Sequence, residues 1–217
     1  MRIAGKPRQA PDRGAALAQY RRRAAVYDLE LALFEPIRRR AIALLALRHG
    51  EVVLDVGCGT GLSFEPLEQG IGAGGRIVGI EQSPEMIERA RERVRRLRWK
   101  NVKLLCAPVE EAAIAGRADA ALFHFTHDIL QQPAAVANVL RHLKPGARVV
   151  ASGLKWAEPW RWPTNLLVLP AALRSVSSLE GLDRPWAALA AAMPDLDVQS
   201  ALMGAVFIAR GTLSAPS

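Results

Sequence analysis

A short apolar run that ends in a cluster of glycines constrains this chain more than any other feature. Val52–Val56 is followed at once by Gly57, and glycines recur at 59 and 61 before a helical segment. Such a run is typical of a buried parallel strand, and glycines let the backbone turn sharply and approach a ligand closely. Amide groups at the start of the next helix would face that ligand. The motif therefore predicts a strand–turn–helix unit with a binding site at the carboxyl end of the strand.

Apolar runs and amphipathic segments alternate along most of the chain, which predicts strands alternating with helices. The predicted strands are Val52–Val56, Arg76–Ile80, Val102–Cys106, Ala118–Phe125, Arg148–Ser152, Val198–Leu202 and Ala205–Ala209. The predicted helices after the motif are Ser63–Glu68, Ser83–Arg98, Pro133–Leu143, which Lys144-Pro145-Gly146 is expected to close, and Trp186–Met193. This order predicts an α/β fold, with an open, mostly parallel seven-stranded sheet, helices on both faces and the last two strands as a hairpin at one edge.

The N-terminal quarter carries nearly all of the excess positive charge. The chain has 29 Lys and Arg against 21 Asp and Glu, a net charge of +8, and residues 1–50 hold 11 basic and 4 acidic side chains. Residues 1–14 combine Gly, Pro and charge without periodicity and predict a mobile basic tail. Residues 15–49 have helical periodicity, interrupted at Pro36, and residues 50–217 form the predicted core. Because the sheet region is almost neutral and contains no recognisable nucleic-acid-binding module, nucleic acid is disfavoured as a partner.

Composition excludes several other classes of protein. A chain of 217 residues, half of them hydrophobic and 23% charged, predicts one globular domain. Two cysteines, Cys58 and Cys106, are too few for a disulfide scaffold or an all-Cys zinc site, and no metal site is expected. The longest apolar runs fall short of the roughly 20 residues of a membrane span, and the basic N-terminus lacks the apolar stretch of a secretory signal. A cytoplasmic location is therefore expected.

The spacing around the glycines narrows the choice of ligand. A dinucleotide fingerprint requires glycine where Leu62 stands and favours an apolar residue where Asp55 stands, so a nicotinamide cofactor is disfavoured. A carboxylate two residues before Gly57 suits an ammonium group instead. Glu81 ends the second predicted strand, 24 residues after Gly57, where an acidic side chain can accept hydrogen bonds from ribose hydroxyls. A ribose joined to an amino acid, without pyrophosphate, describes S-adenosylmethionine.

The stretch VLDVGCGTG, followed by IVGIEQSPEMIERAR, resembles the seven-stranded, Rossmann-like (class I) methyltransferases that use S-adenosylmethionine. The order of elements is similar from about residue 37 to residue 210, and the resemblance is greatest to the bacterial group that acts on small molecules and lipids. It implies that Asp55 and the glycine loop hold the methionine end of the cofactor and that Glu81 binds the ribose. The cofactor-binding residues that it implies are Tyr27, Asp55, Gly57, Cys58, Gly59, Gly61, Glu81, Gln82, Met86 and His124.

The adenine end departs from the family pattern. Many relatives carry Gly-Asp-Ala after the third strand, and that Asp receives the adenine amino group. This chain has Cys106-Ala107-Pro108-Val109-Glu110, so the carboxylate is missing at that position. Backbone groups of Pro108, Val109 and Glu110, or the side chain of Glu110, are expected to bind adenine instead.

The acceptor side is predicted at the end of the fourth strand, which the resemblance places beside the transferable methyl group. His127 could serve there as a general base, with Asp128 orienting it, because imidazole titrates near neutral pH. His124 is expected to pack on the cofactor. The alternatives are that these side chains only cap the strand and the next helix, and that methyl transfer needs alignment alone.

Two further segments are expected on the acceptor side. Similar methyltransferases often fold N-terminal helices over the cofactor, so residues 15–49 are predicted to form a lid that brings Tyr20 to the acceptor, with core packing of this helix face as the alternative. Residues 153–195 are predicted to form an insertion on the same side. Its Trp156 and Trp160 would line an apolar acceptor pocket or lie at a membrane interface.

Three basic runs are expected to be solvated, with attraction to anionic lipid headgroups or to an acidic substrate as the alternative. These runs are Arg21–Arg23, Arg38–Arg40 and Arg89–Lys100. The whole sequence predicts an S-adenosylmethionine-dependent methyltransferase for a hydrophobic small molecule or lipid. The alternatives are a phospholipid amine N-methyltransferase at an anionic membrane surface and a cofactor-binding protein without methylation activity. The sequence does not indicate an oligomeric state.

Overall fold

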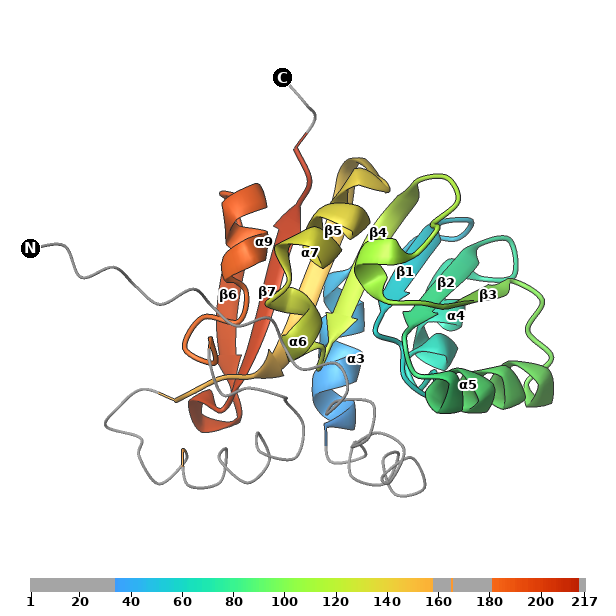
Figure 1. Ribbon diagram of the computed structural model, residues 1–217, viewed down its shortest axis with the longest axis horizontal. Helices are drawn as coiled ribbons and strands as arrows, with labels where there is room; N and C mark the ends of the chain where they lie inside the picture. Colours follow the sequence, from blue (N-terminus) through green and yellow to red (C-terminus); the bar gives the residue numbers. More distant parts are fainter. Residues whose placement is uncertain (1–33, 158–164, 166–180, 215–217) are drawn as a thin grey trace, which may run out of the picture.

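A seven-stranded sheet organises the computed structural model, which describes residues 34–157, 165 and 181–214 (Figure 1). The strand order is β3-β2-β1-β4-β5-β7-β6. The strands are β1 (Val52–Val56), β2 (Arg76–Glu81), β3 (Val102–Cys106), β4 (Ala118–His124), β5 (Leu143–Leu154), β6 (Asp197–Ala201) and β7 (Val206–Thr212). Strands β1 to β5 are parallel, whereas β7 runs antiparallel to both β5 and β6. The predicted α/β fold, with its edge hairpin, is confirmed.

Helices cover both faces of this sheet (Figure 1). One face is covered by α3 (Glu35–Leu44), α4 (Phe64–Ile71) and α5 (Pro84–Arg96), and the other by α6 (His127–Leu130), α7 (Pro133–Arg141), α9 (Ala187–Ala192) and the 3-10 turn η1 (Val109–Glu111). Each face has its own apolar cluster, which is why the central strands have apolar residues on both sides. Within the described ranges, no helix is long and apolar enough to cross a membrane.

Helix α5 begins where the sequence predicts it. The hydroxyl of Ser83 accepts a hydrogen bond from the backbone N–H of Met86 at 3.3 Å, and Pro84 occupies the first turn, where its missing N–H costs nothing. This cap lies two residues after Glu81, which ends β2. The start of α5 is therefore held in place beside the carboxyl edge of the sheet.

The predicted closure of the helix before β5 is wrong. Helix α7 ends at Arg141, and the Lys144-Pro145-Gly146 segment lies within β5. Leu143 pairs with Ala118, whereas Arg148 pairs with Ala120, so the register shifts between these two positions. Leu143 is only 2% exposed, and its burial explains why the strand begins before the proline and glycine rather than after them.

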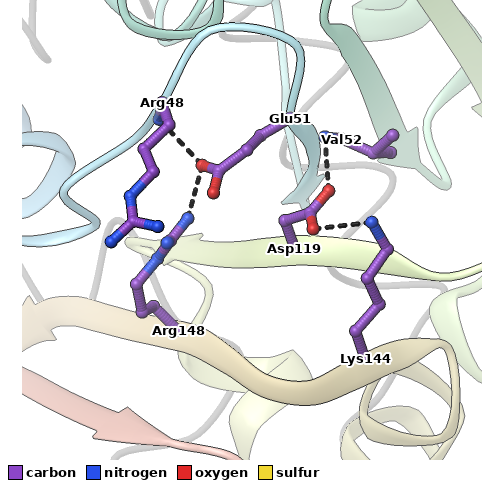
Figure 2. A network of polar contacts seen from close by, with 6 residues as sticks. All are labelled: Arg48, Glu51, Val52, Asp119, Lys144 and Arg148. Carbon is purple, nitrogen blue, oxygen red and sulfur yellow. Dashed lines mark hydrogen bonds and ion pairs between the residues drawn. The ribbon is translucent and has the colours of Figure 1, made fainter.

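Two carboxylates, Glu51 and Asp119, join β1, β4 and β5 near the start of β1 (Figure 2). Glu51, just before β1, forms a largely buried ion pair with Arg148 of β5. Asp119 of β4 accepts hydrogen bonds from the backbone N–H of Val52 at 2.9 Å and from Nζ of Lys144 at 2.6 Å. These contacts tie β1, β4 and β5 together at their amino ends.

Candidate active site

The glycine loop joins β1 to α4 and lies against the ends of β2 and β4. Gly57 has a φ of +69°, and a Cβ atom there would lie 2.5 Å from Cγ2 of Thr126, so the loop requires glycine at this position. The N–H groups of Gly57 and Cys58 donate to the carbonyl of Ile80 at 2.8 and 3.0 Å. These two amides therefore hold the loop against β2, and side chains must supply much of the recognition of a ligand.

An open hollow of about 710 Å³ lies beside this loop. Four segments contribute to it: the glycine loop, the junction of β2 with α5, the η1 turn and the junction of β4 with α6. The described residues that line it are Gly57, Gly59, Glu81, Gln82, Met86, Val109, Glu110, Phe125, Thr126, His127, Asp128, Ile129 and Gln132. The structure thus brings together, around one hollow, most of the residues that the sequence predicts for ribose, adenine and acceptor.

Glu81 connects the glycine loop to the start of α5. Its Oε2 accepts a hydrogen bond from the N–H of Gly59 at 3.2 Å, and its Oε1 accepts one from the N–H of Ser83 at 2.9 Å. Burial raises the pKa of the Glu81 carboxyl, although the N–H groups of Ser83, Gly59 and Gln82 oppose this rise. The carboxylate is a fixed, half-buried acceptor at the position predicted for a ribose diol.

A second hollow, of about 310 Å³, shares Gly57 and Gly59 with the first and contains the most deeply buried polar groups of the site. Its lining consists of Arg38, Asp55, Gly57, Cys58, Gly59, Thr60, Leu62, Ser63 and His124. Asp55 is only 2% exposed. Among the residues described, Oδ2 of Asp55 and Nε2 of His124 are buried without a hydrogen-bond partner. Such orphaned polar atoms are costly, so this hollow is built to receive a polar ligand.

Arg38 corrects the prediction that the run Arg38–Arg40 is solvated. It is only 2% exposed and lines the second hollow, whereas Arg39 is exposed. In α3, Arg38 lies three residues before Ala41 and seven before Leu45, both fully buried, so it belongs to the apolar face of the helix. This spacing is the signal in the sequence that could have identified Arg38 as a buried residue.

Burial and neighbouring charges shift the pKa values of Asp55 and His124, which line the second hollow together with Arg38. Burial raises the pKa of Asp55 to about 7, the charge of Arg38 opposes this rise, and Glu81 adds to it. Burial, and then the charge of Arg38, lowers the pKa of His124 to about 3. The His124 imidazole is therefore neutral at ordinary pH, and its Nδ1 lies 2.7 Å from Oγ of Ser152. Asp55 can change charge near neutral pH when a cation binds beside it.

The predicted acceptor residues lie at the start of α6. His127 is 8% exposed and lines both the first hollow and a third, shallow one, whereas Asp128 lines the first. The described lining of the third hollow is Phe125, His127, Leu130, Ser152, Gly153, Leu154 and Phe207, without Asp, Glu, Lys or Arg. His127 therefore lies at the junction of a polar hollow with an apolar one.

The remaining predicted residues are placed as follows. Pro108 precedes the η1 turn, and Gly61 has a φ of +77° in the glycine loop. Trp156 packs, half-buried, against the apolar cluster on the α3–α4 side of the sheet. Tyr20, Tyr27, Trp160 and residues 15–33 of the predicted lid lie outside the described residues.

A sequence profile described as a methyltransferase domain matches residues 53–146, which include the glycine loop, Glu81 and His127. Residues 53–146 carry a class I methyltransferase domain. The cofactor of this class is S-adenosylmethionine.

Similar proteins include other methyltransferases. Aklanonic acid methyltransferase DauC of Streptomyces sp. (strain C5) is 28% identical over 169 residues, which cover 75% of this methyltransferase and 74% of DauC. A 37.1 kDa protein of transposon TN4556 in Streptomyces fradiae is 35% identical over 116 residues, covering 52% of this chain but only 32% of that protein. N-methyltransferase NodS of Bradyrhizobium japonicum WM9, crystallised with S-adenosyl-L-homocysteine, is 20% identical with a TM-score of 0.60, and the match covers 84% of this chain and 88% of NodS. The likeness to NodS supports the fold.

The residues around the two polar hollows fit S-adenosylmethionine. The orphaned Oδ2 of Asp55 suits the ammonium group, and the buried guanidinium of Arg38 suits the carboxylate of the same amino acid. Glu81 lies within reach of a ribose at the loop, and Met86 and Val109 offer apolar surface for a base. A carboxyl group and a guanidinium in the lining of one small hollow suit the methionine end of this cofactor.

Proposed function

We propose that this methyltransferase transfers the methyl group of S-adenosylmethionine to a hydrophobic small molecule. The observation that carries the proposal is the position of Phe125 and His127, which line both the hollow at the glycine loop and the apolar hollow beyond it. An acceptor in the apolar hollow would lie next to the cofactor without crossing solvent. The similarity to aklanonic acid methyltransferase, over three quarters of both chains, is consistent with this class of acceptor.

The apolar hollow favours a small molecule over a charged headgroup. Its described lining contains no Lys or Arg to bind a phosphate, and its largest members are the rings of Phe125 and Phe207. Phe125 is itself held by ring contacts, with centroids 4.6 Å from Phe34 and 4.8 Å from His124. A phospholipid amine N-methyltransferase therefore has less support on this side of the site than an enzyme for an uncharged acceptor.

When bound, S-adenosylmethionine supplies an electrophilic methyl group on a sulfonium. The protein aligns the two reactants: Asp55 and Arg38 fix the amino acid end, Glu81 fixes the ribose, and the rings near β4 hold the acceptor. The lone pair of the acceptor atom forms the new bond to carbon, the carbon–sulfur bond breaks, and its electron pair stays on sulfur. We assign His127 the proton that the acceptor loses, because it lies where the two hollows meet.

The test is a panel of uncharged phenols, alcohols and amines, assayed for transfer of a labelled methyl group by wild type and by His127→Asn. We expect turnover of at least one panel member and a fall in kcat of about 100-fold in the variant, a size typical of a lost general base. The Kd for S-adenosylhomocysteine should change less than about 2-fold, a difference well below 1 kcal/mol. Tight cofactor binding with no turnover across the panel would favour a cofactor-binding protein, and an unchanged kcat would show that alignment alone suffices.

A further inference from the structure

The segment after β3 forms one border of the hollow, although it lacks the carboxylate that many relatives place there. The chain leaves β3 at Cys106 and makes a single 3-10 turn, η1, whose Val109 and Glu110 line the hollow. The turn has two internal bonds, from the N–H of Glu111 to the carbonyl of Pro108 at 3.0 Å and from that of Ala112 to Val109 at 3.3 Å. A 3-10 turn of this length is weak by itself, so contacts from elsewhere must fix its position.

Asn138 of α7 supplies such a contact. Its Nδ2 donates to the carbonyl of Val109 at 2.5 Å and to the carbonyl of Ala112 at 3.2 Å, so one amide group spans the turn from end to end. The side chain is only 2% exposed, and its Oδ1 has no hydrogen-bond partner among the residues described. A buried amide that leaves one oxygen unsatisfied is costly, and the benefit here is the fixed position of the turn.

We infer that Asn138 is the positioning residue of the adenine subsite. Asn138 holds the η1 turn in the position where the backbone of Val109 and Glu110 borders the base. The main chain, in place of a side-chain carboxylate, then binds adenine. This inference rests on the proposed use of S-adenosylmethionine. It adds a residue on the far side of η1 that does not line the hollow itself.

The chemistry of the base gives a selective test. A backbone N–H that faces N1 of adenine finds an acceptor there, whereas hypoxanthine presents an N–H and would oppose donor to donor. S-inosylhomocysteine is therefore the matched probe for S-adenosylhomocysteine. We expect wild type to bind the adenosyl compound at least about 10-fold more tightly, within the range for one unpaired buried hydrogen-bonding group.

The experiment measures Kd for both compounds by calorimetry in wild type, Asn138→Leu and Asn138→Asp, after thermal melts show which variants fold. Leucine removes both donated bonds at similar volume, and aspartate turns a carboxylate toward two carbonyl oxygens. Each variant should raise the Kd for the adenosyl compound about 10-fold and the Kd for the inosyl compound less than about 3-fold. The preference for the adenosyl compound, measured as the ratio of the two Kd values, should therefore fall. The control is Asn101→Leu, which removes a single bond from Nδ2 to the carbonyl of Gly72, 3.2 Å long, and should leave the ratio unchanged.

Equal weakening of both compounds, or an unchanged ratio, would overturn the inference, because a merely structural residue affects both alike. A wild type that binds both compounds equally overturns it too. If neither Asn138 variant folds, amide hydrogen exchange in wild type decides: at equal saturation, the adenosyl compound should protect the amides of Val109 and Glu110 more than the inosyl compound does. A wild type that binds neither compound contradicts the proposed function instead.

Discussion

Asp55 is a buried carboxyl group that the folded protein stabilises in its protonated form. Burial raises its pKa from an ordinary 3.8 to about 7, so the stability that it contributes is present below about pH 4 and is lost as pH rises through 7. We expect Asp55→Asn to match wild type near pH 4 in the absence of ligand and to be more stable by about 4 kcal/mol at pH 8, because each unit of pKa shift corresponds to about 1.4 kcal/mol. Unfolding in urea at both pH values measures this, and parallel stability curves would contradict it.

Asp55 should lower the stability of the unliganded protein and strengthen the binding of the cofactor. A bound ammonium group favours the ionised carboxylate, so the Asp55→Asn variant would keep its fold and lose affinity for S-adenosylmethionine.

At the scale of single residues, the sequence predicts the Asp55 carboxylate from its place before the glycines, but it does not predict the environment of that carboxylate. The pKa shift is caused by burial and is limited by Arg38, which lies near Asp55 only because α3 packs on this face of the sheet. From the sequence alone, Arg38 is therefore predicted to be solvated like the other members of its basic run. The neutral state of His124 also depends on burial and cannot be predicted from the sequence.

At the scale of elements, the amino ends of the strands offer a test of pH-dependent stability. Partial burial acts to raise the pKa of Asp119, but hydrogen bonds from Lys144 and Val52 and nearby positive charge lower it overall. A lowered pKa contributes stability above the ordinary value, and that stability is lost as pH falls through the folded value. We expect Asp119→Asn to cost about 1 kcal/mol at pH 7 and nothing at pH 2, since Lys144 is half-exposed.

The matched control for Asp119→Asn is Glu88→Gln on α5. Glu88 pairs with Arg91 and Arg95, but all three side chains are at least half-exposed. Water screens such pairs, so the free energy of unfolding should change by less than about 0.5 kcal/mol. A larger loss in the α5 variant than in Asp119→Asn would contradict the importance given to the strand-end contacts.

Elements whose ends carry a local signal are predicted well. The hydroxyl and proline at Ser83-Pro84 identify the start of α5, and β3 has the predicted limits Val102–Cys106. The start of β5 is different, because proline and glycine at 145 and 146 normally end an element. Pairing of Leu143 with Ala118 overrides that local preference, and pairing between segments far apart in sequence is not visible in a local pattern.

At the scale of the whole molecule, alternation predicts an open, mostly parallel sheet with a hairpin at one edge, because parallel strands with helical connections have few topologies. The η1 turn and its tie to Asn138 do not follow, since they join residues 29 and 26 positions apart through one side chain. The charge pattern is similar: the sequence locates a net +7 in residues 1–50, whereas only the fold shows that Arg38 belongs to the site. The periodicity of apolar residues predicts the topology of the sheet. The site depends in addition on which distant residues that topology brings into contact.

Calorimetric titration with S-adenosylmethionine tests the central claim most directly, using wild type, Asp55→Ala and Asp119→Asn as the control far from the site. We predict saturable binding of one cofactor per chain by wild type. Affinity should be at least about 10-fold weaker in Asp55→Ala, as expected when a buried charged partner is removed, and unchanged in Asp119→Asn. A wild type that does not bind the cofactor, or binding that Asp55→Ala leaves intact, would contradict the account.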